Sequence, residues 1–158
     1  MLGPAGAGSN LTVMRLSARG EYAIKAVLDL AVHRNGRLVP IQEIAGRQGI
    51  PQRYLEHVLL ALKRGGLLTS RRGSTGGYLL SRSPEDITVG EVLRAVEGRS
   101  APFESQGEGR ARHREPELAE LWEEISEAVS SVVDRFTFAE LAARAAHRRG
   151  SARAMYHI

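Results

Sequence analysis

The sequence predicts a mainly α-helical fold with one small β-hairpin. Apolar residues recur at helical spacing through most of the chain, whereas residues 67–81 place two short apolar runs around a Gly-rich turn. Glycine and proline separate these stretches and mark their ends. With 158 residues, of which 42% are hydrophobic and 25% charged, the chain can bury one core and has the composition of an ordinary folded domain.

Three helices are expected in the first half of the chain. The first begins at Ser17, whose hydroxyl can cap a free N–H of the first turn, and ends near Asn35-Gly36. The second covers residues 41–48. The third opens at Pro51 and ends at Gly65-Gly66. A short helix, a tight turn and a second helix form a helix-turn-helix.

The hairpin and three further helices follow. Residues 67–81 predict two short strands, so the helix-turn-helix carries a β-hairpin wing. A fourth helix is expected over Thr88–Glu97, opened by a capping box. A long helix runs from about Pro116 to Phe136, and a last helix from Thr137 to about His147.

These elements suggest a single winged helix-turn-helix with a helical extension. The Gly- and Ala-rich start and the basic end lack periodicity. The predicted organisation is a disordered arm (1–13), a winged helix-turn-helix (14–98), a loop (99–114), dimerisation helices (115–147) and a flexible C-terminal tail (148–158).

Charge is distributed unevenly along the chain. Residues 1–80 hold 11 Lys and Arg against four Asp and Glu, a net charge of +7, whereas residues 81–158 hold 11 against 14, a net charge of −3. A basic half indicates a module that binds an anion, and nucleic acid is the obvious polyanion. A merely solvated basic surface has the same charge, so composition alone does not separate the two.

The third helix carries side chains suited to reading base edges. In a helix-turn-helix the second helix enters the major groove of DNA. Glutamine can pair with adenine, arginine with guanine, and glutamate accepts from the amino group of cytosine. An acidic residue contributes little to nonspecific phosphate binding, so its presence favours direct readout over a solvated helix face. The candidate residues are Gln52, Arg53, Glu56 and His57.

The wing supplies a second candidate contact with DNA. Arg71 and Arg72 precede Gly73 at the predicted turn. Glycine lets a thin hairpin approach a phosphate backbone closely, and arginine is attracted by the negative potential of a narrow minor groove. The turn lacks the sequence frame of a nucleotide-binding phosphate loop.

The long helix predicts a dimer. Six apolar residues follow one another at spacings of four and three, which makes a heptad seam too apolar to be left in water. These residues are Leu118, Trp122, Ile125, Val129, Val132 and Phe136.

Catalytic and metal chemistry have little support. The chain has no cysteine, which excludes disulfides, thiol nucleophiles and Cys-ligated metal or iron–sulfur sites. Its five histidines are scattered and show no metal-ligand spacing. We therefore expect no enzyme, no cofactor and no metal. No apolar run is long enough to span a membrane, and a cytoplasmic location fits a chain without cysteine.

Residues 14–147 resemble the Rrf-two family of winged-helix repressors. The similarity runs through MRLSARGEYAIKAVLDLA at 14–31, YLE at 54–56, GGYLL at 76–80 and TFAEL at 137–141. The family includes iron–sulfur cluster regulators and repressors of cysteine metabolism. The resemblance implies a DNA-binding, homodimeric regulator whose partner is double-stranded DNA.

The chain departs from the cluster-binding members of that family. Those members carry three cysteines in a loop that corresponds to residues 98–114, where this chain has none. The resemblance therefore favours the cluster-free cysteine-metabolism branch. Members of that branch are regulated in complex with O-acetylserine sulfhydrylase (cysteine synthase). They end in a short aromatic segment with a terminal isoleucine, similar to Met155, Tyr156, His157 and Ile158 here.

Two other hypotheses remain open at this point. One is a winged-helix regulator that responds to a small-molecule effector bound between the 98–114 loop and the long helix. The other is a protein-interaction module that has lost DNA binding, against which the intact wing and third helix argue.

Overall fold

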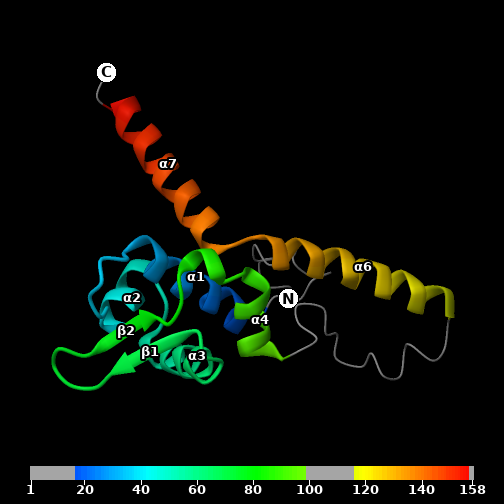
Figure 1. The fold of residues 1–158 in the computed structure, drawn as a ribbon, viewed down its shortest axis with the longest axis horizontal. Helices are drawn as coiled ribbons and strands as arrows, with labels where there is room; N and C mark the ends of the chain where they lie inside the picture. The colour runs from blue at the N-terminus through cyan, green and yellow to red at the C-terminus, as the bar shows by residue number, and fades with distance from the viewer. Residues whose placement is uncertain (1–16, 99–115, 157–158) are drawn as a thin grey trace, which may run out of the picture.

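A computed structural model describes residues 17–98 and 116–156. In these ranges it has six α-helices and one antiparallel hairpin, which confirms the predicted fold class (Figure 1). In chain order the elements are α1 (Ala18–Val32), α2 (Ile41–Gln48), α3 (Gln52–Arg64), β1 (Leu68–Arg71), β2 (Gly77–Leu80), a short 3-10 helix η2 (Pro84–Asp86), α4 (Val89–Glu97), α6 (Pro116–Arg135) and α7 (Phe138–Tyr156).

The helix starts follow the caps that the sequence predicts. Ser17 Oγ accepts a hydrogen bond from the Gly20 N–H at 3.1 Å, and Thr88 Oγ1 accepts one from the Glu91 N–H at 3.2 Å. Each bond satisfies an N–H that has no partner within its helix. The Glu91 carboxylate pairs with Arg82, so it links α4 to the chain after β2.

The hairpin is fastened to the helix-turn-helix by the segment before α2. Val39 and Tyr78 exchange two backbone hydrogen bonds, of 3.0 and 2.8 Å, which adds a short third edge beside β2. Gly77 permits this approach: a Cβ at that position would lie 2.5 Å from the Val39 carbonyl oxygen. A side chain at Gly77 would therefore push the wing away from the body.

The core lies between α1, α2, α3 and α4. Each helix contributes an apolar stripe at helical spacing, as the sequence predicts. Phe138, the first residue of α7, closes this core and is fully buried. The other fully buried apolar side chains include Val27 on α1, Ile44 on α2, Leu55, Leu59 and Leu62 on α3, and Val92 on α4.

Helices α6 and α7 leave the core in different directions (Figure 1). None of the residues of α6 is buried. Its root is tied to α4 by Arg94, whose guanidinium donates two hydrogen bonds to Asp134, of 2.7 and 2.8 Å. In the described part of the chain no helix is long and apolar enough to cross a membrane.

The end of the last helix differs from the prediction. Helix α7 continues to Tyr156, nine residues beyond His147, so residues 148–156 are helical rather than a flexible tail. The basic segment after His147 lacks an apolar period, but its alanines and arginines are strong helix formers and outweigh its one glycine. The first helix also ends earlier than expected, at Val32. The predicted arm 1–13 and loop 99–114 lie outside the described residues.

Candidate DNA-binding surface

One face of α3 is exposed and polar. The four side chains predicted to read bases, Gln52, Arg53, Glu56 and His57, are all exposed. They fall on the side opposite the buried Leu55, Val58, Leu59 and Leu62. Because α3 is held against the core along its whole apolar stripe, its first two turns present these polar side chains from a rigid support.

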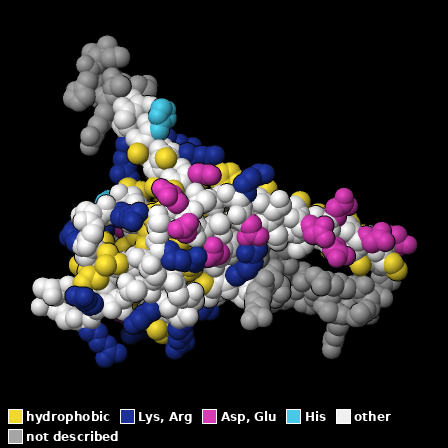
Figure 2. Space-filling view, in the orientation of Figure 1, with side chains coloured by type: hydrophobic (Ala, Val, Ile, Leu, Met, Phe, Trp, Pro, Cys, Tyr) yellow, Lys and Arg dark blue, Asp and Glu magenta, His cyan; other side chains and the backbone are white. Residues whose placement is uncertain are grey.

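The wing lies beside that face. Arg71 is the last residue of β1, Arg72 and Gly73 form the start of the turn, and all three are exposed. Strand β1 packs against α3. Figure 1 places α3 and the hairpin on one side of the body, with α7 projecting from the opposite side. Figure 2 shows Lys and Arg side chains along the α3 and hairpin edge.

Two tyrosines that the sequence reasoning missed support this surface. Tyr54 is 41% exposed on α3, and its ring meets that of Tyr22 edge to face, with 5.2 Å between centroids. Tyr78 on β2 has its pKa raised, chiefly by burial and also by the negative charge of Glu56. The motifs YLE and GGYLL contain Tyr54 and Tyr78, but their spacing in the sequence does not show the Tyr22–Tyr54 contact or the effect of Glu56 on Tyr78.

A buried carboxylate sets the position of α2. Asp29 on α1 is 1% exposed. Arg47 donates to it through Nε and Nη2, both at 2.9 Å, and Gln48 Nε2 donates at 2.9 Å. The hydrogen bond to Asp29 raises the pKa of Arg47. Because α2 precedes α3 in the helix-turn-helix, this anchor also positions the candidate reading helix.

The predicted dimerisation residues lie on α6, except Phe136, and they differ in how far their side chains are exposed. Leu118, Trp122 and Val132 are exposed, whereas Ile125 and Val129 are half-buried. Phe136 lies one residue beyond the end of α6, where its ring packs against Arg144 of its own chain. Leu121, which the seam omitted, is 46% exposed and widens the apolar face. The sequence spacing could have placed Leu121 on this face, since Leu121 and Ile125 are four residues apart on one side of the helix.

The predicted partner-binding tail is only partly described. Met155 and Tyr156 are the last helical residues of α7, and His157 and Ile158 lie outside the described residues. Within residues 17–98 and 116–156, no three His, Asp or Glu side chains come together as a metal site.

Comparison with known proteins identifies the family. Residues 16–144 match the Rrf2 family, described as an iron-dependent transcriptional regulator. The HTH-type transcriptional regulator IscR of Erwinia tasmaniensis is 40% identical over 129 residues, which cover 81% of this chain and 78% of that protein.

Two solved structures have the same fold. CymR (YrzC), the global cysteine regulator of B. subtilis, superposes with a TM-score of 0.70 at 32% identity, covering 82% of this chain and 97% of that one. IscR of T. potens gives 0.68 at 34% identity, covering 83% and 88%. With a family match over most of its length and relatives at this identity, the chain belongs to the Rrf2 family of winged-helix transcriptional regulators.

Proposed function

We propose that this chain is a sequence-specific DNA-binding repressor that acts as a homodimer. The observation that carries the proposal is the exposed polar row of α3 beside the exposed arginines of the wing, on one side of the body. Helix α3 enters the major groove, where Gln52 pairs with adenine, Arg53 with guanine, and Glu56 accepts from cytosine. The wing contacts phosphates or the adjacent minor groove through Arg71 and Arg72.

Salt dependence tests the DNA interface. Arg71→Ala and Arg72→Ala are each expected to weaken operator binding and to reduce the slope of log affinity against log salt by about one, the effect of one lost phosphate contact. Arg149→Ala is the matched control, because this exposed arginine lies on α7, away from the wing. Gel-shift titrations on DNA upstream of the gene, at several salt concentrations, measure both quantities. Unchanged slopes for both wing variants would exclude the wing from the interface.

The apolar face of α6 supplies the second half of the proposal. Leu118, Leu121, Trp122 and Val132 are each at least 40% exposed. A contiguous face of large apolar residues on a monomer marks an interaction site. Pairing it across a two-fold axis places two reading helices about 34–36 Å apart, one turn of DNA. Ile125→Glu is expected to give monomers with much weaker operator binding, measured by sedimentation and gel shift. If the Ile125→Glu variant still forms a dimer, two copies of the chain do not pair through α6.

We propose that the iron dependence in the family description does not extend to this chain. Iron–sulfur clusters are held mainly by Cys thiolates. This chain has no cysteine at any position, and its described residues form no alternative cluster of His, Asp and Glu ligands. The donor set therefore does not fit a cluster of that kind, and we propose regulation without one.

The finer proposal is control of cysteine or sulfur metabolism through a complex with O-acetylserine sulfhydrylase. It is supported by the similarity to the global cysteine regulator of B. subtilis. The absence of cysteine residues also favours the branch of the family that binds no cluster. The segment from Met155 to Ile158 offers the branched apolar side chain of Ile158, which an apolar pocket can capture. Helix α7 ends at Tyr156, on the side of the molecule away from the wing (Figure 1).

A peptide experiment tests the finer proposal separately. A peptide of residues 149–158 is expected to bind the sulfhydrylase and to be displaced by O-acetylserine. Removing Ile158 from the full chain should abolish the complex and leave DNA binding intact, because the end lies outside the winged helix. If the full chain forms the complex while the peptide does not bind, the contact lies elsewhere.

A further inference from the structure

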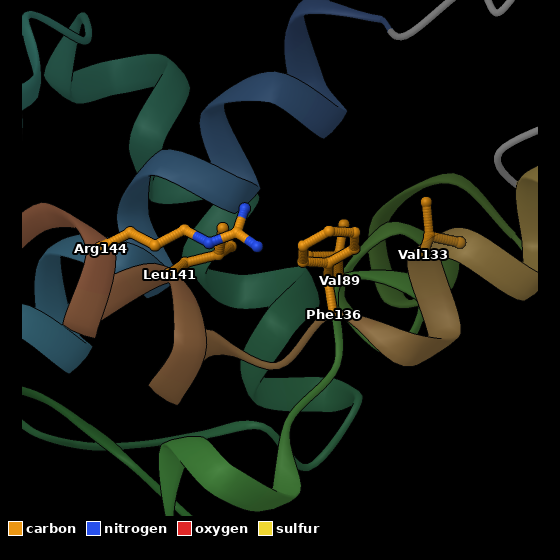
Figure 3. A pocket seen from close by; sticks show the side chains of 5 residues that line it. All are labelled: Val89, Val133, Phe136, Leu141 and Arg144. Carbon is orange, nitrogen blue, oxygen red and sulfur yellow. The ribbon is translucent and has the colours of Figure 1, made fainter.

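Leu60 is an exposed leucine that neither the core nor the proposed dimer explains. Six large apolar side chains of the described residues are at least 40% exposed, and four of them lie on α6, the helix of the proposed dimer. Figure 3 shows an apolar groove at the root of that helix, lined in part by Val133 and Phe136. The other two exposed side chains, Tyr54 and Leu60, lie on α3, and the ring of Tyr54 meets that of Tyr22. The exposure of Leu60 therefore needs another reason.

Leu60 lies in the middle of the exposed polar row of α3. Successive residues of an α-helix are rotated by about 100°, so side chains three and four positions away are the neighbours on one side. For Leu60 these neighbours are Glu56 and His57 one turn before it, and Lys63 and Arg64 one turn after it. All four are exposed. The buried stripe of α3 faces the other way, so a leucine stands among polar side chains on the side proposed to face DNA.

Cations border Leu60 on both sides along the helix. Arg53 lies two turns before it and Arg64 one turn after it, on the same side. Neither guanidinium has an ion-pair partner among residues 17–98 and 116–156. The two arginines are therefore available to a polyanion, and they are about 16 Å apart along the helix axis. A nucleic acid that contacts both must also cover Leu60 between them.

The major groove of DNA offers one apolar group to such a side chain. The edges of guanine, adenine and cytosine present hydrogen-bond donors and acceptors there, whereas thymine also presents its C5-methyl group. A leucine pressed against donors and acceptors leaves them without partners, which is unfavourable. Against the thymine methyl group, the same leucine removes apolar surface from water on both sides of the contact. A thymine is therefore the base that Leu60 favours.

We propose that Leu60 is a specificity-determining residue that contacts the C5-methyl group of one thymine in each operator half-site. Leu60 is four residues beyond Glu56, about 6 Å along the helix axis. Successive base pairs are about 3.4 Å apart. With α3 lying along the groove, the thymine is about two base pairs from the position that Glu56 contacts. This inference rests on the proposed entry of α3 into the major groove and adds an apolar contact to its hydrogen bonds.

Removing the methyl group from the DNA tests the contact directly. The full-length wild-type chain first selects its site from random-sequence duplexes. Each thymine of that site is then replaced by deoxyuridine, which lacks only the C5-methyl group. Gel-shift titrations should show one position in each half-site where this replacement weakens wild-type binding about fourfold, the equivalent of one buried methyl group.

Variants of the protein assign that effect to Leu60. Leu60→Ala should bind thymine and deoxyuridine equally at this position, because its side chain is too short to reach the methyl group. Leu60→Met should keep most of the preference, since methionine has a similar volume and reach. Alanine favours helices and position 60 is exposed, so the Tm of Leu60→Ala should match wild type. Glu56→Ala is the control, and it should retain the preference of about fourfold at this thymine while losing discrimination about two base pairs away.

Two different failures are distinguishable. If no thymine in the selected site is sensitive to loss of its methyl group, or if Leu60→Ala keeps the same sensitivity as wild type, Leu60 does not contact a thymine and the inference is wrong. The deoxyuridine scan on the wild-type chain gives the first of these results without any variant. A wild-type chain that selects no preferred sequence would instead overturn the proposed function itself.

Discussion

Replacing Arg47 with alanine tests the buried anchor between α1 and α2. Of the three side-chain hydrogen bonds to the Asp29 carboxylate, Arg47 donates two. Removing one partner of a buried ion pair typically costs about 3–5 kcal/mol, because the other charge stays buried without compensation. The Arg47 side chain is 31% exposed, so water enters the vacated space and Gln48 still donates. We therefore expect a loss of about 3 kcal/mol, near the lower limit of that range.

The assay is urea denaturation followed by circular dichroism, with thermal unfolding as a second measure. A loss of about 3 kcal/mol lowers Tm by roughly 6–12 °C in a chain of this size. Arg37→Ala is the control, since the Arg37 side chain is 56% exposed and pairs with Glu43 at 3.2 Å. An exposed pair of this kind contributes at most about 1 kcal/mol. If Arg47→Ala loses no more stability than Arg37→Ala, the buried anchor does not hold α2 in place.

Three further predictions concern the α4–α6 joint and the reading helix. Gly90→Ala should lower the free energy of unfolding in urea by about 1–3 kcal/mol, because the added Cβ would lie 2.0 Å from Asp134 Oδ1. Gly46→Ala should raise it by up to about 1 kcal/mol, because open space surrounds that position. Hydrogen bonds from Arg94 lower the pKa of Asp134. The stability that Asp134→Asn loses at neutral pH should therefore shrink as pH falls below 3.8. A difference in stability between variant and wild type that does not change with pH would contradict the pairing. Glu56→Ala should relax discrimination at one base pair by about 1–3 kcal/mol in competition binding, whereas equal weakening on every operator variant would make Glu56 structural.

Local signals predicted most of the winged helix. Ser17 and Thr88 cap their helices through side-chain oxygens, and a cap depends only on residues within three positions. The polar row of α3 was also predictable, since a strict apolar stripe fixes which side faces water. The hairpin was found for the same reason, because Gly-rich turns and short apolar runs are local features.

Contacts between distant residues could not be predicted in this way. Asp29 and Arg47 are 18 residues apart on different helices, and only their packing shows that the carboxylate is buried. Phe136 fitted the heptad spacing, yet α6 ends at Arg135 and the ring packs against Arg144 after the chain turns. The end of α7 differs from the prediction because residues 148–156 lack an apolar period, although the alanines and arginines in them favour a helix.

The short turn between α6 and α7 is fastened to the start of α4. Val89 N–H donates to the Phe136 carbonyl at 3.0 Å, and Phe138 N–H donates to the Ile87 carbonyl at 3.0 Å. Helix α4 in turn packs against α3. A small rotation of α6 about this turn is amplified at the far end of the helix. A rotation of about 5° would move that end, about 30 Å away, by roughly 2.6 Å. In the proposed homodimer, a tilt of α6 would therefore act on α4 and on α3 behind it, and it would change the spacing of the two reading helices.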